Sequence, residues 1–184
     1  MTSEREKMVA GELYLATDPE LTAARTRARR LWQRYNATDP ESEVERAVIL
    51  RDLIGRMGTG VAIEPPFYCD YGSQIELADG VFVNFNCVFL DPAAIRIGRQ
   101  TMLAPNVQLL TADHPRDPHV RVSGPELARP IAIGERVWIG GGTIVCPGVT
   151  IGDDTTIGAG SVVVRDIPGG VVAAGNPCRV LRSL

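Results

Sequence analysis

The most regular feature of the chain is an aliphatic residue at every sixth position between residues 133 and 163. This position is held by Ile133, Ile139, Val145, Ile151, Ile157 and Val163. A glycine follows one place later at Gly134, Gly140, Gly152 and Gly158. A period of six is neither the 2.0 of a strand nor the 3.6 of a helix, and it is typical of a hexapeptide parallel β-helix. We therefore predict a mainly β fold in which the aliphatic side chains fill the interior and glycine keeps the corners uncrowded.

The same period occurs upstream, with two interruptions. It runs through Leu77, Val83 and Phe89, slips by two residues, and resumes at Ile97, Leu103 and Leu109. Between residues 111 and 130 it lapses, and prolines and glycines accumulate, so we predict a loop extruded from the coils. A long irregular segment in a compact repeat protein is usually functional.

The first 60 residues follow a helical pattern instead. Leu21, Ala24, Ala28, Leu31 and Tyr35 recur at helical spacing, and arginines take the remaining faces. A second helix is predicted from Asp39-Pro40-Glu41, an N-cap signal, to the glycines at 55 and 58. We expect residues 1–60 to form an N-terminal helical segment that caps the open end of a β-helix domain at 61–184. Flat stacked faces also favour a closed oligomer.

Composition narrows the class of protein. The 184 residues are 45% hydrophobic and carry a formal net charge of −3, which argues against a general nucleic-acid or anionic-membrane surface. The N-terminus is charged and no run is apolar enough to span a bilayer, so we expect a cytoplasmic protein with no membrane contact. The four cysteines are scattered without paired spacing, which indicates reduced thiols rather than disulfides or a zinc site.

His114 is the strongest candidate for chemistry, because it lies in the one segment that leaves the repeat. A neutral imidazole there could take a proton from an attacking hydroxyl. A surface histidine in a turn explains the residue equally well from the pattern alone. His119 is the only other histidine, and two histidines cannot supply a three-histidine zinc site, so no metal is expected. The glycines follow the hexad register and form no Walker or Rossmann loop.

Several segments together resemble the maltose and galactoside O-acetyltransferases, with the maltose branch nearest. The resemblance runs from residues 7–14 (KMVAGELY) to 174–179 (AGNPCR). Between them lie EPPF at 64–67, CDYG at 69–72, NFN at 84–86, MLAP at 102–105, HP at 114–115, SGPEL at 123–127 and VWIGG at 137–141. The resemblance therefore covers nearly the whole chain.

The resemblance implies a left-handed parallel β-helix and a homotrimer with active sites between subunits. It also implies acetyl transfer from acetyl-CoA to a sugar hydroxyl, commonly the 6-hydroxyl, on a sugar such as maltose or glucose. By motif match His114 would be the general base for direct attack on the thioester. A backbone N–H near Gly141 would stabilise the developing oxyanion.

The family's binding residues carry over onto particular positions. On the acceptor side they match Asp70 and Asn84, with Asp18 as a third candidate and Glu126 in the loop that should set acceptor identity. Asp91 stands beside a family acidic position, and Pro92 replaces an acid of the galactoside branch. The coenzyme A contacts match Asn84, Ala104, Gly141, Ala159, Val164, Arg165, Arg179 and Arg182. Small residues would let the pantetheine arm lie along the coils, and the arginines suit phosphates.

Three alternatives stay open at this point. The same fold could acetylate another acceptor, such as an amine of a nucleotide sugar, an antibiotic or serine. Transfer could pass through an acetylated thiol, at Cys146 or Cys87. The chain could also be a trimeric scaffold that binds a partner through the loop, in which case it would release no CoA when offered sugars.

Overall fold

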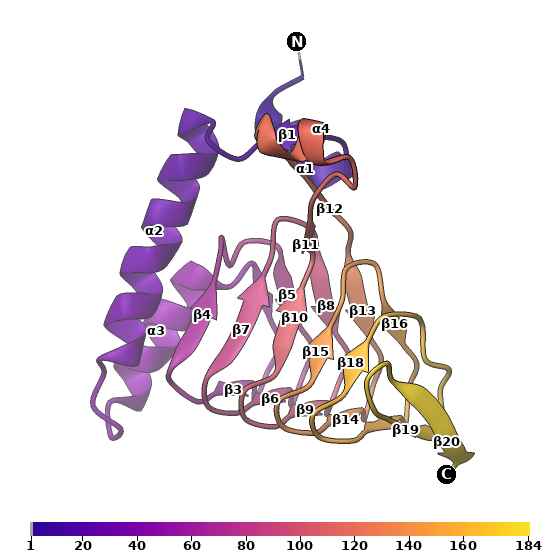
Figure 1. Ribbon diagram of the computed structural model, residues 1–184. Helices are drawn as coiled ribbons and strands as arrows, with labels where there is room; N and C mark the ends of the chain where they lie inside the picture. The colour runs from indigo at the N-terminus through magenta and orange to yellow at the C-terminus, as the bar shows by residue number, and fades with distance from the viewer. Residues whose placement is uncertain (1) are drawn as a thin grey trace.

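The computed structural model describes residues 2–184 as a β-helix of triangular coils with helices at its N-terminal end (Figure 1). Its three faces are parallel sheets, which we call front, back and base. The front sheet contains β4 (Phe67–Cys69), β7 (Cys87–Leu90), β10 (Gln108–Leu110), β15 (Ile144–Val145) and β18 (Val162–Val163). The back sheet contains β2 (Arg56–Met57), β5 (Ile75–Leu77), β8 (Ile95–Ile97), β13 (Ile131–Ile133) and β16 (Thr150–Ile151). The base sheet contains β3 (Ala62–Ile63), β6 (Phe82–Val83), β9 (Met102–Leu103), β14 (Trp138–Ile139), β17 (Thr156–Ile157), β19 (Val171–Ala174) and the antiparallel β20 (Arg179–Ser183).

The six-residue period marks the interior, as predicted. Ile133 pairs with Ile97 on one side and Ile151 on the other, and all three side chains are buried. A Cβ at Gly134 would collide with Asp153 of the next coil, so glycine at this hexad position permits close stacking. The coils turn in the left-handed sense, as the resemblance implied.

Two N-terminal helices, α2 (Pro19–Asn36) and α3 (Glu43–Leu53), cover the first coil, which confirms the predicted cap. The short α1 (Glu4–Ala10) instead lies against α2 and the strands β1 (Tyr14–Leu15) and β12 (Pro125–Ala128). Trp32 of α2 packs edge-on against Tyr68 of β4, with ring centroids 5.2 Å apart. The Asn36 amide bonds both the N–H and the C=O of Phe67, so α2 also satisfies backbone groups of the first front strand.

The boundaries of the second helix differ from the prediction. Asp39 accepts the N–H of Glu41 in a separate turn, and α3 begins only at Glu43. The helix ends at Leu53 rather than at a glycine, because the backbone is already extended at Ile54. Gly55 has a different role, since it passes close to the carbonyl of Ser73. The first coil strand, β2, already lies at 56–57, so the β-helix begins before residue 61.

The segment 111–130 is not the irregular loop that the pattern predicted. It contains β11 (Ala112–Asp113), α4 (Pro118–Val122) and β12 (Pro125–Ala128). β12 pairs antiparallel with β11 and with the N-terminal β1 (Tyr14–Leu15), giving a small sheet in the order β1-β12-β11. The segment is therefore an anchored hairpin, which we call the 112–128 hairpin. Its pairing with residues about 110 positions away leaves no trace in the local sequence.

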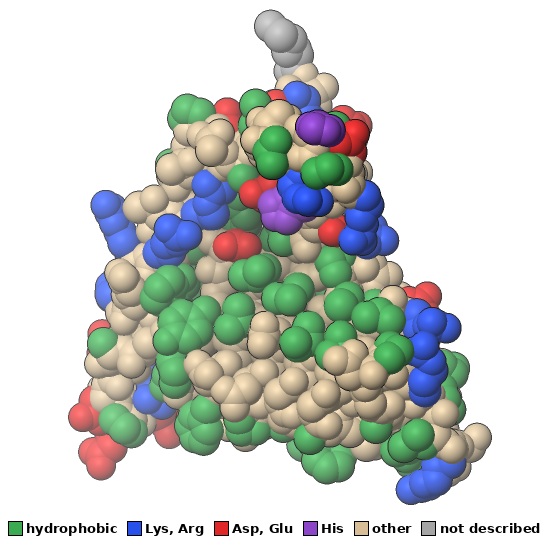
Figure 2. Space-filling view, viewed as in Figure 1, with side chains coloured by type: hydrophobic (Ala, Val, Ile, Leu, Met, Phe, Trp, Pro, Cys, Tyr) green, Lys and Arg blue, Asp and Glu red, His purple; other side chains and the backbone are tan. Residues whose placement is uncertain are grey.

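The front sheet carries an apolar outer surface. Figure 2 shows hydrophobic side chains gathered over this face. The outward positions alternate with the buried ones and include Tyr68, Val88, Leu90, Leu110, Ile144 and Val162. A continuous surface of this kind marks an interaction site. Within residues 2–184, every helix is too short or too polar to cross a membrane.

Candidate active site

The predicted site residues gather at two opposite edges of the front sheet. The upper edge, where the front sheet turns into the back sheet, carries the 112–128 hairpin with His114 and Glu126, together with Asp70 and Asp91. The lower edge, where the base sheet turns into the front sheet, carries Asn84, Ala104, Gly141 and Ala159.

His114 follows directly after β11, at the point where the hairpin leaves the coils. Its side chain is exposed, and its backbone N–H donates to Oδ1 of Asp113 at 2.9 Å. The other oxygen of Asp113 accepts Arg129 Nη2 at 2.9 Å, so both ends of the hairpin are tied together below the histidine. Within the described residues the imidazole nitrogens of His114 make no hydrogen bond, so the ring is accessible to an acceptor substrate.

Glu126 lies across the hairpin from this histidine. Leu127 pairs with Asp113, which places the neighbouring Glu126 beside position 114. Its Oε2 accepts the phenol of Tyr14 at 3.1 Å. Burial first, and then the charge of Glu126, raises the pKa of Tyr14, so the phenol stays a hydrogen-bond donor at neutral pH.

Asp70 is half-buried in the turn between β4 and β5. Burial raises the pKa of its carboxyl, Arg25 and Arg29 of α2 lower it, and Glu126 raises it. The charges of both α2 and the hairpin therefore influence the pKa of Asp70. Four groups from separate elements form a polar cluster at the upper edge: Asp70, Glu126, Tyr14 and Arg25.

The carboxylates of Asp91 and Asp18 accept hydrogen bonds from backbone N–H groups and do not point into an open site. Asp91 is fully buried, and its carboxylate accepts three backbone N–H groups of the turn that carries Asp70. An acceptor sugar cannot reach it, so the direct contact expected for Asp91 is wrong. Asp18 is the N-cap of α2 and accepts the N–H groups of Glu20 and Leu21.

The predicted coenzyme A positions are open and small along the lower edge. A Cβ at Gly141 would lie 3.2 Å from the carbonyl oxygen of Pro105, so the coil corner leaves little room there for a side chain. Ala159 is exposed on the next coil. Asn84 bends back at this edge, where its Oδ1 accepts the N–H of Phe85 at 2.7 Å.

The remaining coenzyme A candidates lie toward the C-terminal end. Val164 and Arg165 follow β18 and are exposed at the upper edge of the last front strand. Arg179 and Arg182 are exposed on β20, which is the outermost strand of the base sheet. The structure does not bring these four residues together with Ala104 or Gly141 in one pocket.

One chain does not unite the two halves of the predicted site. His114 and Asp70 lie at the upper edge, whereas Asn84 and Gly141 lie at the lower edge. Three to four strand residues separate the edges, and at about 3.3 Å per residue the gap is roughly 10 Å or more. A single hydroxyl could not contact both sets.

The four cysteines are unpaired, and their thiols are poor nucleophiles. Burial raises the pKa of Cys87 to about 11 and also raises that of Cys146. Both thiols stay protonated at neutral pH, whereas a covalent route would need the thiolate. Within residues 2–184 no three His, Cys, Asp or Glu side chains are grouped to hold a metal ion.

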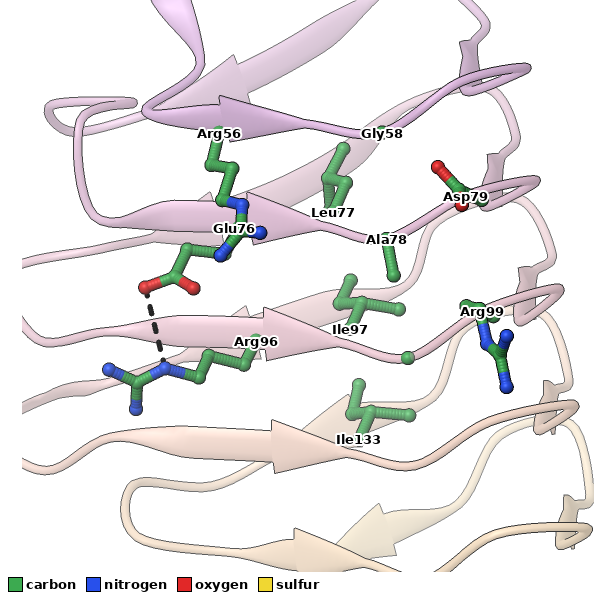
Figure 3. Close-up of a pocket in the computed structure, with 11 residues that line it drawn as sticks. Arg56, Gly58, Glu76, Leu77, Ala78, Asp79, Arg96, Ile97, Arg99 and Ile133 are labelled. Carbon is green, nitrogen blue, oxygen red and sulfur yellow. Dashed lines mark ion pairs between the residues drawn. The ribbon is translucent and has the colours of Figure 1, made fainter.

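A hollow of 380 Å³ opens at a different place, the corner between the back and base sheets (Figure 3). Its wall includes the ion pair of Arg96 with Glu76 at 3.4 Å. Gly58 and Gly98 line the hollow without side chains, because a Cβ at either position would overlap the backbone of the next coil. The hollow follows from coil stacking, and none of the predicted site residues lines it.

The sequence analysis missed Arg25, Tyr14 and Tyr71. The helical pattern leaves Arg25 on one of the faces that the arginines share, but its guanidinium donates to the Tyr71 phenol at 2.8 Å and to the carbonyl of Ala16. Nothing in the helical pattern distinguishes Arg25 from the other arginines of α2. The signals available were the family segments themselves, because KMVAGELY at 7–14 contains Tyr14 and CDYG at 69–72 contains Tyr71.

Comparison with known proteins agrees with this geometry. Residues 7–58 match the family model described as the maltose acetyltransferase hexapeptide capping motif, and residues 130–165 match the bacterial transferase hexapeptide model of six repeats. The fold and site thus define a hexapeptide-repeat acyltransferase.

Individual relatives specify the family. The chain is 47% identical to a maltose O-acetyltransferase from Clostridium difficile 630, whose crystal structure covers 99% of this chain and 97% of its own at a TM-score of 0.98. A galactoside acetyltransferase in complex with coenzyme A is 38% identical, with a TM-score of 0.95 and coverage of 100% and 92%. Nodulation protein L of Rhizobium leguminosarum is 51% identical, with coverage of 97% and 94%. The chain belongs to the maltose and galactoside O-acetyltransferase family and is an acetyltransferase.

Proposed function

We propose that this protein transfers the acetyl group of acetyl-CoA to a hydroxyl of a small sugar, with His114 as general base. The observation that carries the proposal is the hairpin, which presents an exposed imidazole next to the polar cluster of Asp70, Glu126 and Arg25. Family membership supports acetyl-CoA as the acetyl donor, because the solved structure of a 38% identical relative contains bound coenzyme A.

The chemistry needs one proton acceptor and one oxyanion donor. The sugar hydroxyl oxygen attacks the thioester carbonyl while its proton passes to the neutral imidazole of His114. The negative charge that develops on the carbonyl oxygen is stabilised by a backbone N–H near Gly141. The C–S bond then breaks, and the CoA thiolate takes the proton from the imidazolium, which regenerates the base.

A homotrimer would complete the site. The apolar front sheet gives each chain a surface to bury, and association would place the upper edge of one chain against the lower edge of its neighbour. His114 of one subunit would then face the Asn84 and Gly141 edge of the next. This arrangement explains why a single chain leaves the two sets of residues apart.

The acceptor side suits a polyhydroxylated ligand. Asp70, Glu126 and Asn84 offer carboxylate and amide oxygens that accept sugar hydroxyls, and Arg25 adds donors. We assign the 6-hydroxyl of a sugar such as maltose or glucose as the attacking group, in line with the family. Asp18 caps α2, and we propose that it lies at the margin of the acceptor site.

The coenzyme A arm would follow the lower edge. Ala104, Gly141 and Ala159 present backbone without bulky side chains, which leaves room for a pantetheine chain along the coils. Arg179 and Arg182 are exposed cations for the phosphates, whereas the other two candidates, Val164 and Arg165, lie at the upper edge of the last front strand and would contact the coenzyme from there. We place the reaction in the cytoplasm, because four unpaired thiols suit a reducing compartment.

A thiol-release assay tests the proposal. Purified protein is mixed with acetyl-CoA and, in separate reactions, maltose, glucose, a galactoside, glucosamine and serine, and free CoA is measured. We expect release that depends on the neutral sugars and an O-acetylated product by mass spectrometry. Release of CoA with glucosamine or serine alone would indicate an amino acceptor. If no compound causes release of CoA, a non-enzymatic scaffold would be favoured.

A further inference from the structure

Asp91 differs from the other Asp, Glu, Lys, Arg and His side chains that the structure describes. Its side chain has no exposed surface, and among residues 2–184 it is the one acidic or basic residue in the buried core. A buried carboxylate is costly unless several donors compensate it.

All three donors belong to a single turn on the preceding coil. Oδ1 of Asp91 accepts the N–H groups of Asp70 at 3.1 Å and Tyr71 at 2.8 Å, and Oδ2 accepts the N–H of Gln74 at 3.2 Å. One side chain thus holds the turn 70–74, which links β4 to β5, from its first residue to its last.

The same turn is also held from the other side. Gly72 has a φ of +74°, and a Cβ there would overlap the Leu53 carbonyl at the end of α3. Its carbonyl accepts the N–H of Gly55 at 2.9 Å. The turn 70–74 is clamped between α3 and Asp91, so its side chains have a defined direction.

The fold alone does not require a carboxylate at this corner. Thr111 occupies the equivalent place one coil further on, because Leu110 pairs with Leu90 and each residue directly follows its strand. The hydroxyl of Thr111 accepts the N–H of Ala93 at 3.0 Å and donates to the carbonyl of Leu90 at 2.8 Å. A threonine therefore suffices to tie the corner of one coil to the coil before it.

What differs between the two corners is the residue that the held turn presents. The turn 70–74 presents Asp70 to the polar cluster at the upper edge, and it presents the Tyr71 phenol to Arg25 at 2.8 Å. The Arg25 guanidinium also lies 5.7 Å from the centre of the Tyr71 ring. The buried carboxylate acts directly behind these groups.

We propose that Asp91 is a positioning residue of the acceptor site, which sets acceptor affinity by holding the turn 70–74 so that Asp70, and Arg25 through its bond to the buried Tyr71 phenol, face the bound sugar. This inference rests on the proposed function, because it takes Asp70 as an acceptor contact. It assigns to Asp91 an action through Asp70 instead of a contact of its own.

Steady-state kinetics of four variants tests this role. The variants are Asp91→Asn, Asp70→Asn, the double variant, and Thr101→Val as a matched control. Thr101 is equally buried and loses two backbone hydrogen bonds, to Gly134 and Val137, at a corner away from the acceptor cluster. Urea unfolding of each variant shows whether it folds and how much stability it loses.

We expect Asp91→Asn and Asp70→Asn each to raise the acceptor KM tenfold or more, with kcat and the acetyl-CoA KM changed less than threefold. The double variant should resemble Asp70→Asn, because two residues that act through one contact are not additive. Thr101→Val should lose stability without any change in acceptor KM.

Two results would overturn the role of Asp91. The first is an unchanged acceptor KM in Asp91→Asn while Asp70→Asn raises it. The second is a parallel loss of all kinetic parameters in Asp91→Asn and Thr101→Val, which would show a structural role only.

A failure of the proposed function has a different signature. In that case the wild-type protein acetylates no sugar, or Asp70→Asn leaves the acceptor KM unchanged. Hydrogen exchange still tests the clamp, since Asp91→Asn should speed exchange of the Tyr71 and Gln74 amides at least tenfold over Thr101→Val. Equal exchange in the two variants would refute it.

Discussion

The phenol of Tyr14 donates a hydrogen bond of 3.1 Å to Oε2 of Glu126, and so joins two residues that are 112 positions apart. Tyr14 lies in β1 and Glu126 in β12, where the two residues are also paired in register. The N-terminal segment is therefore part of the support of the 112–128 hairpin, and through it of His114.

Tyr14→Phe should weaken this support. We expect a loss of about 1 kcal/mol in the free energy of unfolding, which is typical of one buried hydrogen bond, and a several-fold rise in acceptor KM. Urea unfolding and kinetics measure the two effects. Tyr35→Phe is the control, because it removes the bond of an equally buried phenol to the Ile63 carbonyl, away from the hairpin. An equal rise in KM for both variants would contradict the prediction.

His114→Ala should lower kcat by several hundredfold or more, within the range of general-base removal. The exposed imidazole holds no part of the fold, so the melting temperature and CoA binding should stay at wild-type values. Single-turnover CoA release and calorimetric CoA titration measure these properties. His119→Ala in α4 serves as the control and should keep full activity; a His114→Ala variant with near-normal turnover would rule the base out.

Arg129→Ala should lower kcat about tenfold with little loss of stability. The Asp113–Arg129 pair is partly exposed, and such pairs contribute about 0–1 kcal/mol. Its loss frees the carboxylate that bonds the backbone of His114, and misplaced catalytic groups cost rate. Arg116→Ala is the matched control, because Arg116 reaches the same carboxylate at 3.5 Å but is 86% exposed. Equal kcat values for the two variants would show that the pair does not orient the base.

Asp91 should make stability depend on pH. Burial raises the pKa of this carboxyl to about 7 against the pull of its three N–H donors, with Asp70 adding repulsion. The unfolded carboxyl titrates near 3.9. Between these values the folded state binds more protons, so the free energy of unfolding should fall as pH rises from about 4 to 7 and then level off.

Urea unfolding of wild type and Asp91→Asn at pH 5 and pH 8 measures this effect. The stability of the wild type relative to the variant should be lower at pH 8. The nearby Cys69 thiol does not titrate in this window, because burial first, and then the charge of Asp91, raises its pKa further. A relative stability that increases with pH would show that the N–H groups outweigh burial.

Leu110→Glu should break the proposed trimer. Leu110 points outward from the front sheet and would be buried in the proposed trimer interface. A glutamate there would bury a charge without a partner, which is costly. Light scattering should give a monomer, and activity should fall with it because the two edges no longer meet. Ala132→Glu, at an outward position on the polar back sheet, should stay assembled and active. A Leu110→Glu protein that remains a trimer would place the interface elsewhere.

The hexad register needed only the sequence. Each six-residue unit repeats the same local geometry, so Ile133, Ile139 and Val145 reveal the interior without any long-range information. The glycine that follows four of the six aliphatic positions indicates the close approach of the next coil in the same way. The family motifs added the resemblance that names His114 and Asp70 as candidates.

The tertiary structure decided what the repeat does not encode. The pairing of β1 with β12, the burial of Asp91 under the turn 70–74 and the placement of Arg25 against Tyr71 join residues that are distant along the chain. Such contacts depend on which elements pack together, and no local period records them. The separation of His114 from Gly141 across the front sheet likewise emerges only once the coils are stacked, because sequence distance says nothing about which edge of a coil a corner occupies.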